Sequence, residues 1–267
     1  MIPVYVPSKG RVETSATLRA LESESYPDVR VIVPPAEVDT YAARWKAQSG
    51  GTATSGWHVS AQRGTGIQGA RQTILEDARW SGDRNVWMLD DDISAVLRRK
   101  ALPPGYGFER VTFEQAFDAM VTTVALDGPD LVNGYEIALA GPQFRQYAWS
   151  GPDVAVDVHL RNFILLDTAA PIEYPEYLKE DLDVVLQAIT KGWHTLRFSS
   201  YAFTSPTMGT LDGGCSDDYA DGLLEDATAR IANRWPGIVT VVHDKKLDKF
   251  VNRVNWRKAR EIGRSRT

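Results

Sequence analysis

The stretch of sequence that decides the fold runs from Asn85 to Ser94 and reads N-V-W-M-L-D-D-D-I-S. Residues 86–89 form a short apolar run that follows turn residues, which is typical of a strand buried on both faces. The run ends in three carboxylates, Asp90, Asp91 and Asp92, which repel one another unless a positive charge lies among them. Ligands of parallel α/β sheets bind at the carboxyl ends of the strands, so we expect a ligand site here.

The acidic triplet suits a divalent cation. Because side chains alternate along a strand, Asp90 and Asp92 are expected to point to one side and Asp91 to the other. Two carboxylates open to water suit a hard cation, Mn²⁺ or Mg²⁺, that also binds phosphate oxygens. An isolated acidic triplet is commonly a solvated turn, but the apolar run before this one favours the metal site.

The composition is that of an ordinary globular protein. Of 267 residues, 43% are hydrophobic and 24% are charged, and a chain of this length can bury a substantial core. No apolar run approaches the length of a membrane-spanning helix, and the first residues do not form a signal pattern. The single cysteine, Cys215, excludes an internal disulfide framework. We therefore expect a cytoplasmic enzyme.

The charge of the chain is unevenly distributed. Residues 245–267 contain nine basic and two acidic residues, a net charge of +7, which leaves −12 on the rest of a chain whose total is −5. This asymmetry indicates a polyanionic partner, although composition alone leaves a solvated terminal helix as an alternative. Phe250 and Trp256 lie in the same segment and could stack on bases or anchor the segment to the body.

The first half of the chain alternates between strand and helix patterns. Strands are predicted at 2–6, 29–33, 57–61 and 85–89, and helices at 14–25, 38–48 and 67–79. This alternation predicts an α/β fold with a mostly parallel, mixed sheet flanked by helices.

The second half has a less regular pattern. Helices are predicted at 113–126, 180–190 and 219–235, strands at 131–137, 154–166, 193–203 and 238–242, and a loop at 103–107. Because no repeat or low-complexity linker interrupts the chain, we expect one domain over residues 1–244. Its halves would be a nucleotide-sugar half (1–95) and an acceptor half (96–244), followed by a basic tail (245–267).

A glycine motif offers an alternative function. Residues 64–69, G-T-G-I-Q-G, match the dinucleotide fingerprint, follow a predicted strand and open a predicted helix, as in an NAD-dependent oxidoreductase. The motif follows the third strand rather than the first, however, and three acids stand where the fingerprint needs one. Arg63 and Arg71 flank the glycines, which favours a diphosphate neutralised by side chains.

Several motifs, taken in order, resemble a known fold. The P-S-K-G-R loop (7–11), the helix with G-A-R-Q (69–72), L-D-D-D-I (89–93) and E-D-L-D (180–183) resemble the GT-A fold, a Rossmann-like fold of nucleotide-diphospho-sugar transferases, and in particular inverting family 2 enzymes. Gln72 replaces the usual Asn of that helix.

A narrower resemblance rests on three of the sequence features. The N-terminal I-P-V-Y-V-P-S-K-G-R, the late E-D pair and the loop G-G-C-S-D-D-Y (213–219) are similar to those of the TET-associated glycosyltransferases of bacteriophages. Members of that family are understood to put sugars on 5-hydroxymethylpyrimidines in DNA.

The resemblance implies a site for a UDP-sugar donor. The loop after the first strand would hold the nucleobase and ribose through Pro7, Ser8, Lys9 and Arg11. Arg71, together with Arg63, would neutralise the diphosphate. For Lys9 and Arg11 the alternative is plain surface charge, but their place at the carboxyl end of a strand favours a ligand.

The acidic triplet would be the D-x-D motif of this family. Asp92 would bind Mn²⁺ or Mg²⁺ directly, Asp90 would share the ion and lie nearer the ribose, and Asp91 would belong to the nucleotide-sugar site. His243, at the end of the last predicted strand, would be a further metal ligand, although a histidine there is more often a surface residue.

The resemblance also supplies a catalytic base. Glu180 and Asp181 open a predicted helix, where acids are favoured by the helix dipole whatever their function. In the resembled family this E-D pair takes the proton of the acceptor hydroxyl. We expect Asp181 to be the base, with Glu180 as the second candidate.

Acceptor contacts are expected in the second half and the tail. The candidates are Trp149, Asp217, Asp218, Lys245, Lys246, Arg253 and Arg257. Trp149 could equally belong to the core, and the two acids could equally cap the helix that follows them. His58, His159 and His194 are expected to be structural.

The sequence therefore predicts a metal-dependent, inverting glycosyltransferase. It would move a sugar from a UDP-sugar to the hydroxyl of 5-hydroxymethylcytosine, or another 5-hydroxymethylpyrimidine, in phage DNA inside the host cytoplasm. A transferase with the same donor site but a glycan or protein acceptor is the first alternative. The oxidoreductase and a non-catalytic DNA-binding module are the second and third.

Overall fold

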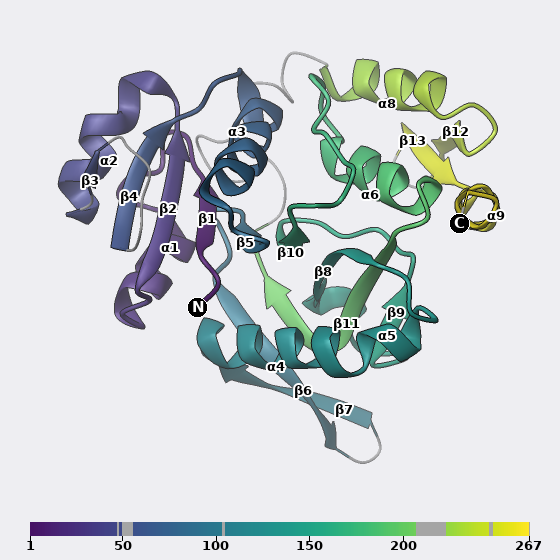
Figure 1. Ribbon diagram of the computed structural model, residues 1–267, viewed down its shortest axis with the longest axis horizontal. Coiled ribbons are helices and arrows are strands. Elements are labelled where there is room, and N and C mark those ends of the chain that lie inside the picture. The colour runs from purple at the N-terminus through teal and green to yellow at the C-terminus, as the bar shows by residue number, and fades with distance from the viewer. Residues whose placement is uncertain (47, 50–55, 103–104, 207–222, 246–247, 267) are drawn as a thin grey trace.

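The protein has helices on both faces of one large sheet (Figure 1). It is described here from a computed structural model that covers residues 1–46, 48–49, 56–102, 105–206, 223–245 and 248–266. Among the helices of these residues, none is long and apolar enough to cross a membrane.

Within the described residues the sheet has eleven strands in the order β3-β4-β2-β1-β5-β10-β8-β11-β6-β7, with β9 paired to β11. The bounds are β1 Val4–Pro7, β2 Asp28–Val33, β3 Gln48–Ser49, β4 Gly56–Ala61, β5 Asn85–Leu89, β6 Ala95–Leu102, β7 Gly105–Val111, β8 Ile137–Phe144, β9 Val154–Val156, β10 Phe163–Asp167 and β11 His194–Thr204. The helices are α1 Ala16–Ser23, α2 Val38–Trp45, α3 Gly66–Ser81, α4 Phe113–Leu126, α5 Gly128–Leu131, α6 Glu180–Thr190, α8 Leu223–Arg234 and α9 Trp256–Arg264, with 3₁₀ turns η1 Pro35–Glu37 and η2 Arg145–Tyr147.

The expected α/β class with a mixed sheet is confirmed. Strands β1 to β5 of the front half pair in parallel with one another, and β8 pairs in parallel with β11. Strand β10 runs antiparallel between β5 and β8, with Phe163 opposite Leu89. The amino end of β10 therefore lies beside the carboxyl end of β5.

Strand β5 is buried on both faces, as its sequence predicts. On one face Trp87 stacks on Phe117 of α4, with ring centroids 4.3 Å apart, in a core that also includes α1 and α2. On the other face Met88 packs in the core formed with α3 and α6. Burial on both sides fixes the strand and thus the position of the acids that follow it.

The structure differs from the predicted elements in three places. The strand expected at 131–137 begins only at Ile137, because α5 and two residues with positive φ, Asn133 and Gly134, come before it. The strand expected at 154–166 is divided into β9 and β10. Strands β6 and β7 pair antiparallel with each other where no strand was predicted.

The basic segment that follows residue 244 is folded onto the body. Strand β12 (Val239–Asp244) pairs antiparallel with β13 (Lys249–Val254), and α9 packs against α6. The approach is close enough that a Cβ on Gly263 would lie 2.1 Å from the carbonyl oxygen of Ile189. In Figure 1 this unit lies beside α6 and α8.

Candidate active site

A cleft with a volume of 1130 Å³ opens at one edge of the sheet. Its floor is formed where β1, β5, β8 and β11 end, at Ser8, Asp90, Phe144 and Ser205. The walls come from the first turns of α3 and α6 and from β13. The cleft thus lies at the carboxyl ends of strands, where the sequence places the ligand.

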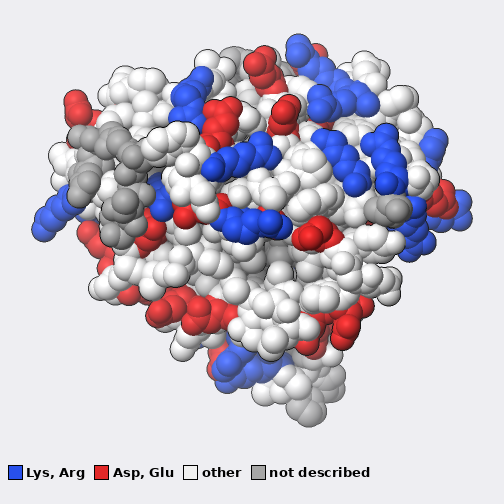
Figure 2. Space-filling view, in the orientation of Figure 1, with Lys and Arg blue, Asp and Glu red and all other residues white. Residues whose placement is uncertain are grey.

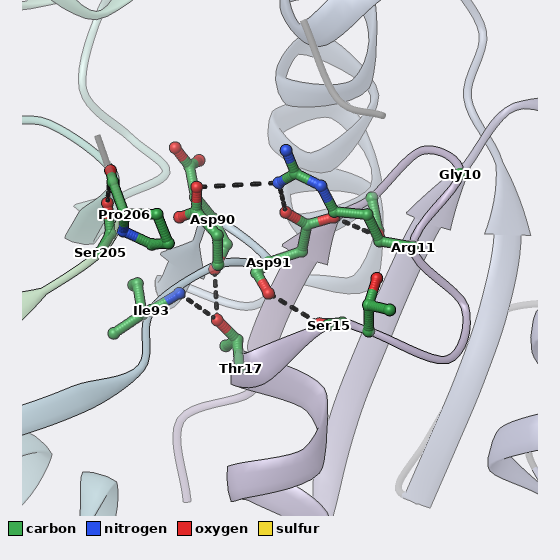
Figure 3. Close-up of polar contacts among 12 residues, drawn as sticks. Gly10, Arg11, Ser15, Thr17, Asp90, Asp91, Ile93, Ser205 and Pro206 are labelled. Carbon is green, nitrogen blue, oxygen red and sulfur yellow. Dashed lines mark hydrogen bonds and ion pairs between the residues drawn. The ribbon is translucent and has the colours of Figure 1, made fainter. Parts of the chain in front are cut away.

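The acidic turn after β5 is pinned to the start of α1 (Figure 3). Thr17 Oγ1 donates to the carbonyl oxygen of Asp90 at 2.6 Å and accepts from the backbone N–H of Ile93 at 2.9 Å. Ser15 Oγ donates to the carbonyl oxygen of Asp91 at 2.8 Å. The turn's backbone is therefore satisfied by one helix terminus, which holds the three carboxylates in fixed directions.

Asp91 ties the first loop to the acidic turn. It is buried and accepts from Ser8 Oγ at 2.5 Å and from Arg11 Nη1 at 2.6 Å. Ser8 also bonds to Tyr41 Oη at 2.8 Å. Ser8, Arg11 and Asp91, all predicted at the nucleotide-sugar site, are thus brought together, and Pro7 and Lys9 line the same cleft.

Asp90 and Asp92 fit a bound cation. Asp92 Oδ1 is buried without a hydrogen-bond partner among the described residues, and burial, with the charges of Asp90 and Asp91, raises the pKa of Asp92 to about 7. A cation would satisfy that oxygen and offset the repulsion. Within the described residues no three His, Cys, Asp or Glu side chains form a complete metal site, so a bound ion would need ligand oxygens as well.

Arg71 connects the two acidic groups of the cleft. Its buried guanidinium donates from Nη2 to Asp90 Oδ1 at 2.7 Å, and its Nη1 lies 2.9 Å from Glu180 Oε1. Arg71 lines the cleft, but its two terminal nitrogens already have acidic partners in the protein. Its contact with a diphosphate remains a prediction.

Glu180 and Asp181 open α6, as predicted, and line the cleft. Burial raises the pKa of Glu180 to about 7 against the opposing charge of Arg71. The pKa of Asp181 is lowered, because its neighbours His159 and Arg161 outweigh the effect of its burial. Two adjacent acids are thus driven apart in pKa, and Asp181 is the one that stays ionised.

The third acid of this helix serves the fold. Asp183 is fully buried and accepts from Tyr177 Oη at 2.5 Å, Gln187 Nε2 at 2.6 Å and Trp235 Nε1 at 3.0 Å. These bonds fix α6 against the end of α8. They leave Glu180 and Asp181 as the acids of this helix that face the cleft.

Lys179 joins the start of α6 to the C-terminal hairpin. It adopts a left-handed conformation (φ 67°), and its Nζ donates to Thr228 Oγ1 at 2.5 Å and Asn252 Oδ1 at 2.6 Å. Burial lowers the pKa of Lys179 to about 8. The strained backbone of Lys179 is held in place by its bonds to α8 and β13. It therefore sets the direction in which the side chains of Glu180 and Asp181 point into the cleft.

Three predicted residues are not brought to the cleft. Arg63 instead bonds to Glu76 and Asp77 on α3 at 3.0 and 2.7 Å. His243 is exposed on β12, with Nε2 3.3 Å from Asp248 Oδ1, and is not among the described residues that line the cleft. Trp149 packs edge-on against Phe108, outside the described lining, whereas its neighbour Tyr147 lines the cleft.

The remaining predicted acceptor residues belong to the basic segment or lie outside the described residues. Lys245, Arg253 and Arg257 are exposed on the hairpin and α9. Figure 2 shows Lys and Arg side chains gathered on the part of the surface that carries α8, α9 and this hairpin. Asp217, Asp218 and Lys246 lie outside the described residues.

The glycine motif has a packing role. A Cβ on Gly69 would lie 2.5 Å from the carbonyl carbon of Gly64, and Gly66 has a φ of +65°. The loop before α3 therefore crosses the helix's first turn in direct backbone contact. These glycines are explained by this contact without a dinucleotide.

Four residues of the site were missed by the sequence analysis. His159 and Arg161, just before β10, and Lys179 and Asn252 all line the cleft. The available signal was the polar H-L-R-N group directly before an apolar strand. To place this group in the cleft, one must know the direction in which β10 runs, and a hydrophobic pattern does not give that direction.

Comparison with known proteins identifies a family and a solved structure with some similarity. The family described as TET-Associated Glycosyltransferase matches residues 2–213. A protein of Desulfovibrio desulfuricans G20, assigned as a nucleotide-diphospho-sugar transferase, is similar at 12% identity and a TM-score of 0.34, over 68% of this chain and 75% of that one. Because the TM-score is so low, nothing about this protein is concluded from that similarity. No curated protein matches the sequence.

Proposed function

The chain belongs to the TET-associated glycosyltransferase family, and from this premise we propose that it moves a sugar from a UDP-sugar to the hydroxyl of a 5-hydroxymethylpyrimidine in DNA. The observation that carries the proposal is the meeting of two acidic groups in one cleft. Asp90 and Asp92 lie at the end of β5, Glu180 and Asp181 lie at the start of α6, and Arg71 bonds to one member of each group.

The donor would bind at the β1 and β5 side of the cleft. Ser8 and Arg11, held by Asp91, would contact the nucleoside, and Lys9 lines the cleft from the same loop. Asp90 and Asp92 would hold a Mn²⁺ or Mg²⁺ ion. When bound, such an ion supplies Lewis-acid stabilisation of the charge that develops on the leaving diphosphate.

Asp181 would act as the base. As the acceptor oxygen forms its bond to the anomeric carbon, its proton passes to the Asp181 carboxylate, and the bond to the diphosphate breaks with its electron pair. Attack from the face opposite the diphosphate inverts the anomeric centre. The lowered pKa of Asp181, due to His159 and Arg161 acting against burial, keeps this carboxylate ionised and ready to accept the proton.

The acceptor side of the cleft suits a polyanion. Lys179, Lys249 and Arg161 line it, and the exposed basic surface of the hairpin and α9 adjoins it. Phe250 and Tyr147, which are 57% and 61% exposed, also line the cleft and offer aromatic faces for stacking. A target base within a duplex would have to be extruded for its hydroxyl to reach Asp181.

The test is a measurement of product mass. The protein is incubated with Mn²⁺, a panel of UDP-sugars, and DNA that contains 5-hydroxymethylcytosine, 5-hydroxymethyluracil or only unmodified bases. The masses of the product nucleosides are then measured by mass spectrometry. We expect one sugar to be added to a hydroxymethylated nucleoside alone. Hydrolysis of a UDP-sugar without transfer to any DNA would favour a glycan or protein acceptor instead.

A further inference from the structure

His159 lies beside Asp181, the proposed base, in the cleft. Its Nε2 is 3.0 Å from Asp181 Oδ2, and its Nδ1 accepts from Arg161 Nε at 3.3 Å. All three side chains line the cleft. Arg161 Nε also lies 3.9 Å from Asp181 Oδ2, so the three groups form one compact cluster.

The contact with Arg161 determines the tautomer of the ring. A guanidinium nitrogen can only donate, so Nδ1 must present its lone pair to Arg161. A neutral imidazole then carries its proton on Nε2, which faces Asp181. Nε2 is buried and is not aligned for a formed hydrogen bond within the described residues, as is common for catalytic contacts before substrate binds.

The carboxylate of Asp181 is held from two sides. Oδ1 accepts from the backbone N–H of Leu182 at 2.7 Å, and Oδ2 faces His159. Each carboxylate oxygen has a second lone pair, so an acceptor hydroxyl can still donate to it. The titratable and charged groups around this carboxylate are His159, Arg161, Arg71, Lys179, Glu180 and Tyr174.

We propose that His159 is a positioning residue for the proposed base: its Nε2–H orients the Asp181 carboxylate towards the acceptor and keeps it ionised, while Arg161 fixes the ring. This inference rests on the proposed function. It assigns His159 no bond to the substrate and no transfer of the proton, which ends on Asp181.

The kinetic test compares two substitutions. In His159→Gln the side-chain amide replaces the Nε2–H donor, whereas His159→Leu fills a similar volume without a donor. With hydroxymethylated DNA we expect His159→Leu to lower kcat roughly 10- to 100-fold, with KM for the UDP-sugar unchanged, and to move the acidic limb of the pH profile to higher pH. His159→Gln should restore most of kcat. A His159→Leu enzyme with the wild-type kcat and pH profile would overturn the inference.

A second measurement needs no activity and separates this inference from the proposed function. Long-range ¹H–¹⁵N spectra resolve ring tautomers, and the chain has only four histidines, of which His58, His194 and His243 serve as internal references. We expect His159 to carry its proton on Nε2. We also expect the ring ¹⁵N chemical shifts of His159 to change in Asp181→Asn, while those of the three reference histidines stay the same. A proton on Nδ1, or no response, would refute the inference even if transfer is observed; failure of transfer with the expected spectrum would refute only the proposed function.

Discussion

Arg71 and Glu180 form a buried ion pair, with Nη1 2.9 Å from Oε1, between two helices that lie far apart in the sequence. The same guanidinium bonds to Asp90, so one cation neutralises an acid from each half of the cleft. A buried charge that loses its partner costs several kcal/mol. Arg71 therefore holds the proposed donor and acceptor sides at a fixed separation before any ligand binds.

This pair makes stability depend on pH. Burial raises the pKa of Glu180 to about 7, so the folded chain binds that proton more tightly than the unfolded chain does. The stabilising contribution is complete below the unfolded pKa of about 4.3 and is lost as the pH rises through about 7. Between about pH 5 and about pH 8 we expect the metal-free wild type to lose roughly 2 kcal/mol more unfolding free energy than Glu180→Gln.

Thermal or denaturant unfolding at the two pH values measures this difference. The matched control is Glu176→Gln, an exposed acid in the segment before the same helix, which should keep the wild-type pH dependence. Equal pH dependence in the wild type and Glu180→Gln would contradict the assignment of a raised pKa to Glu180.

The basic surface should contribute to DNA binding through phosphate contacts. Arg253→Gln and Arg257→Gln each remove an exposed charge, so we expect weaker binding of all DNA sequences and a shallower salt dependence. The slope of log K against log salt should fall by about 0.9 for each phosphate that the variant no longer neutralises. Arg84→Gln, a 57% exposed arginine at the opposite end of β5 from the acidic turn, is the control. Unchanged slopes in both variants would exclude this surface as the DNA contact.

Point substitutions are preferable to a deletion of residues 245–267, because α9 packs on α6. A Cβ at position 263 would meet the carbonyl oxygen of Ile189 at 2.1 Å, so Gly263→Ala should destabilise the protein by about 1–3 kcal/mol. Gly105→Ala, with no described atom within 4 Å of the added Cβ, should be nearly neutral. Equal unfolding free energies for the two variants would show that α9 does not dock as described.

The acidic residues of the site could be identified from the sequence. An apolar run ending in acids indicated that Asp90 and Asp92 lie at a ligand-binding edge. Glu180 and Asp181 were identified by the family resemblance, because an acidic first turn is ordinary in any helix. Both pairs line the cleft. Their roles as metal ligands and base rest on family resemblance and remain predictions.

The other features of the site depend on contacts between distant segments, which a local sequence pattern does not reveal. His159 and Arg161 reach the cleft because β10 runs antiparallel to β5, and periodicity is the same for either direction. In α9 many charges obscure a narrow buried stripe that includes Ala259 and Gly263, so the segment was predicted as a tail. His243 was expected as a metal ligand from the family resemblance, but in the β12–β13 hairpin it is exposed beside Asp248.

The most direct test of the account is a calorimetric titration of UDP into the protein with and without Mn²⁺. Asp92 has a buried oxygen with no hydrogen-bond partner in the described part of the chain, so we expect Mn²⁺ to tighten UDP binding at least about tenfold in the wild type and not in Asp92→Asn. Asp130→Asn, an exposed acid on α5, is the control and should behave as the wild type. Equal tightening by Mn²⁺ in Asp92→Asn, or no effect of Mn²⁺ in the wild type, would contradict the claim that the acidic turn holds the donor through a cation.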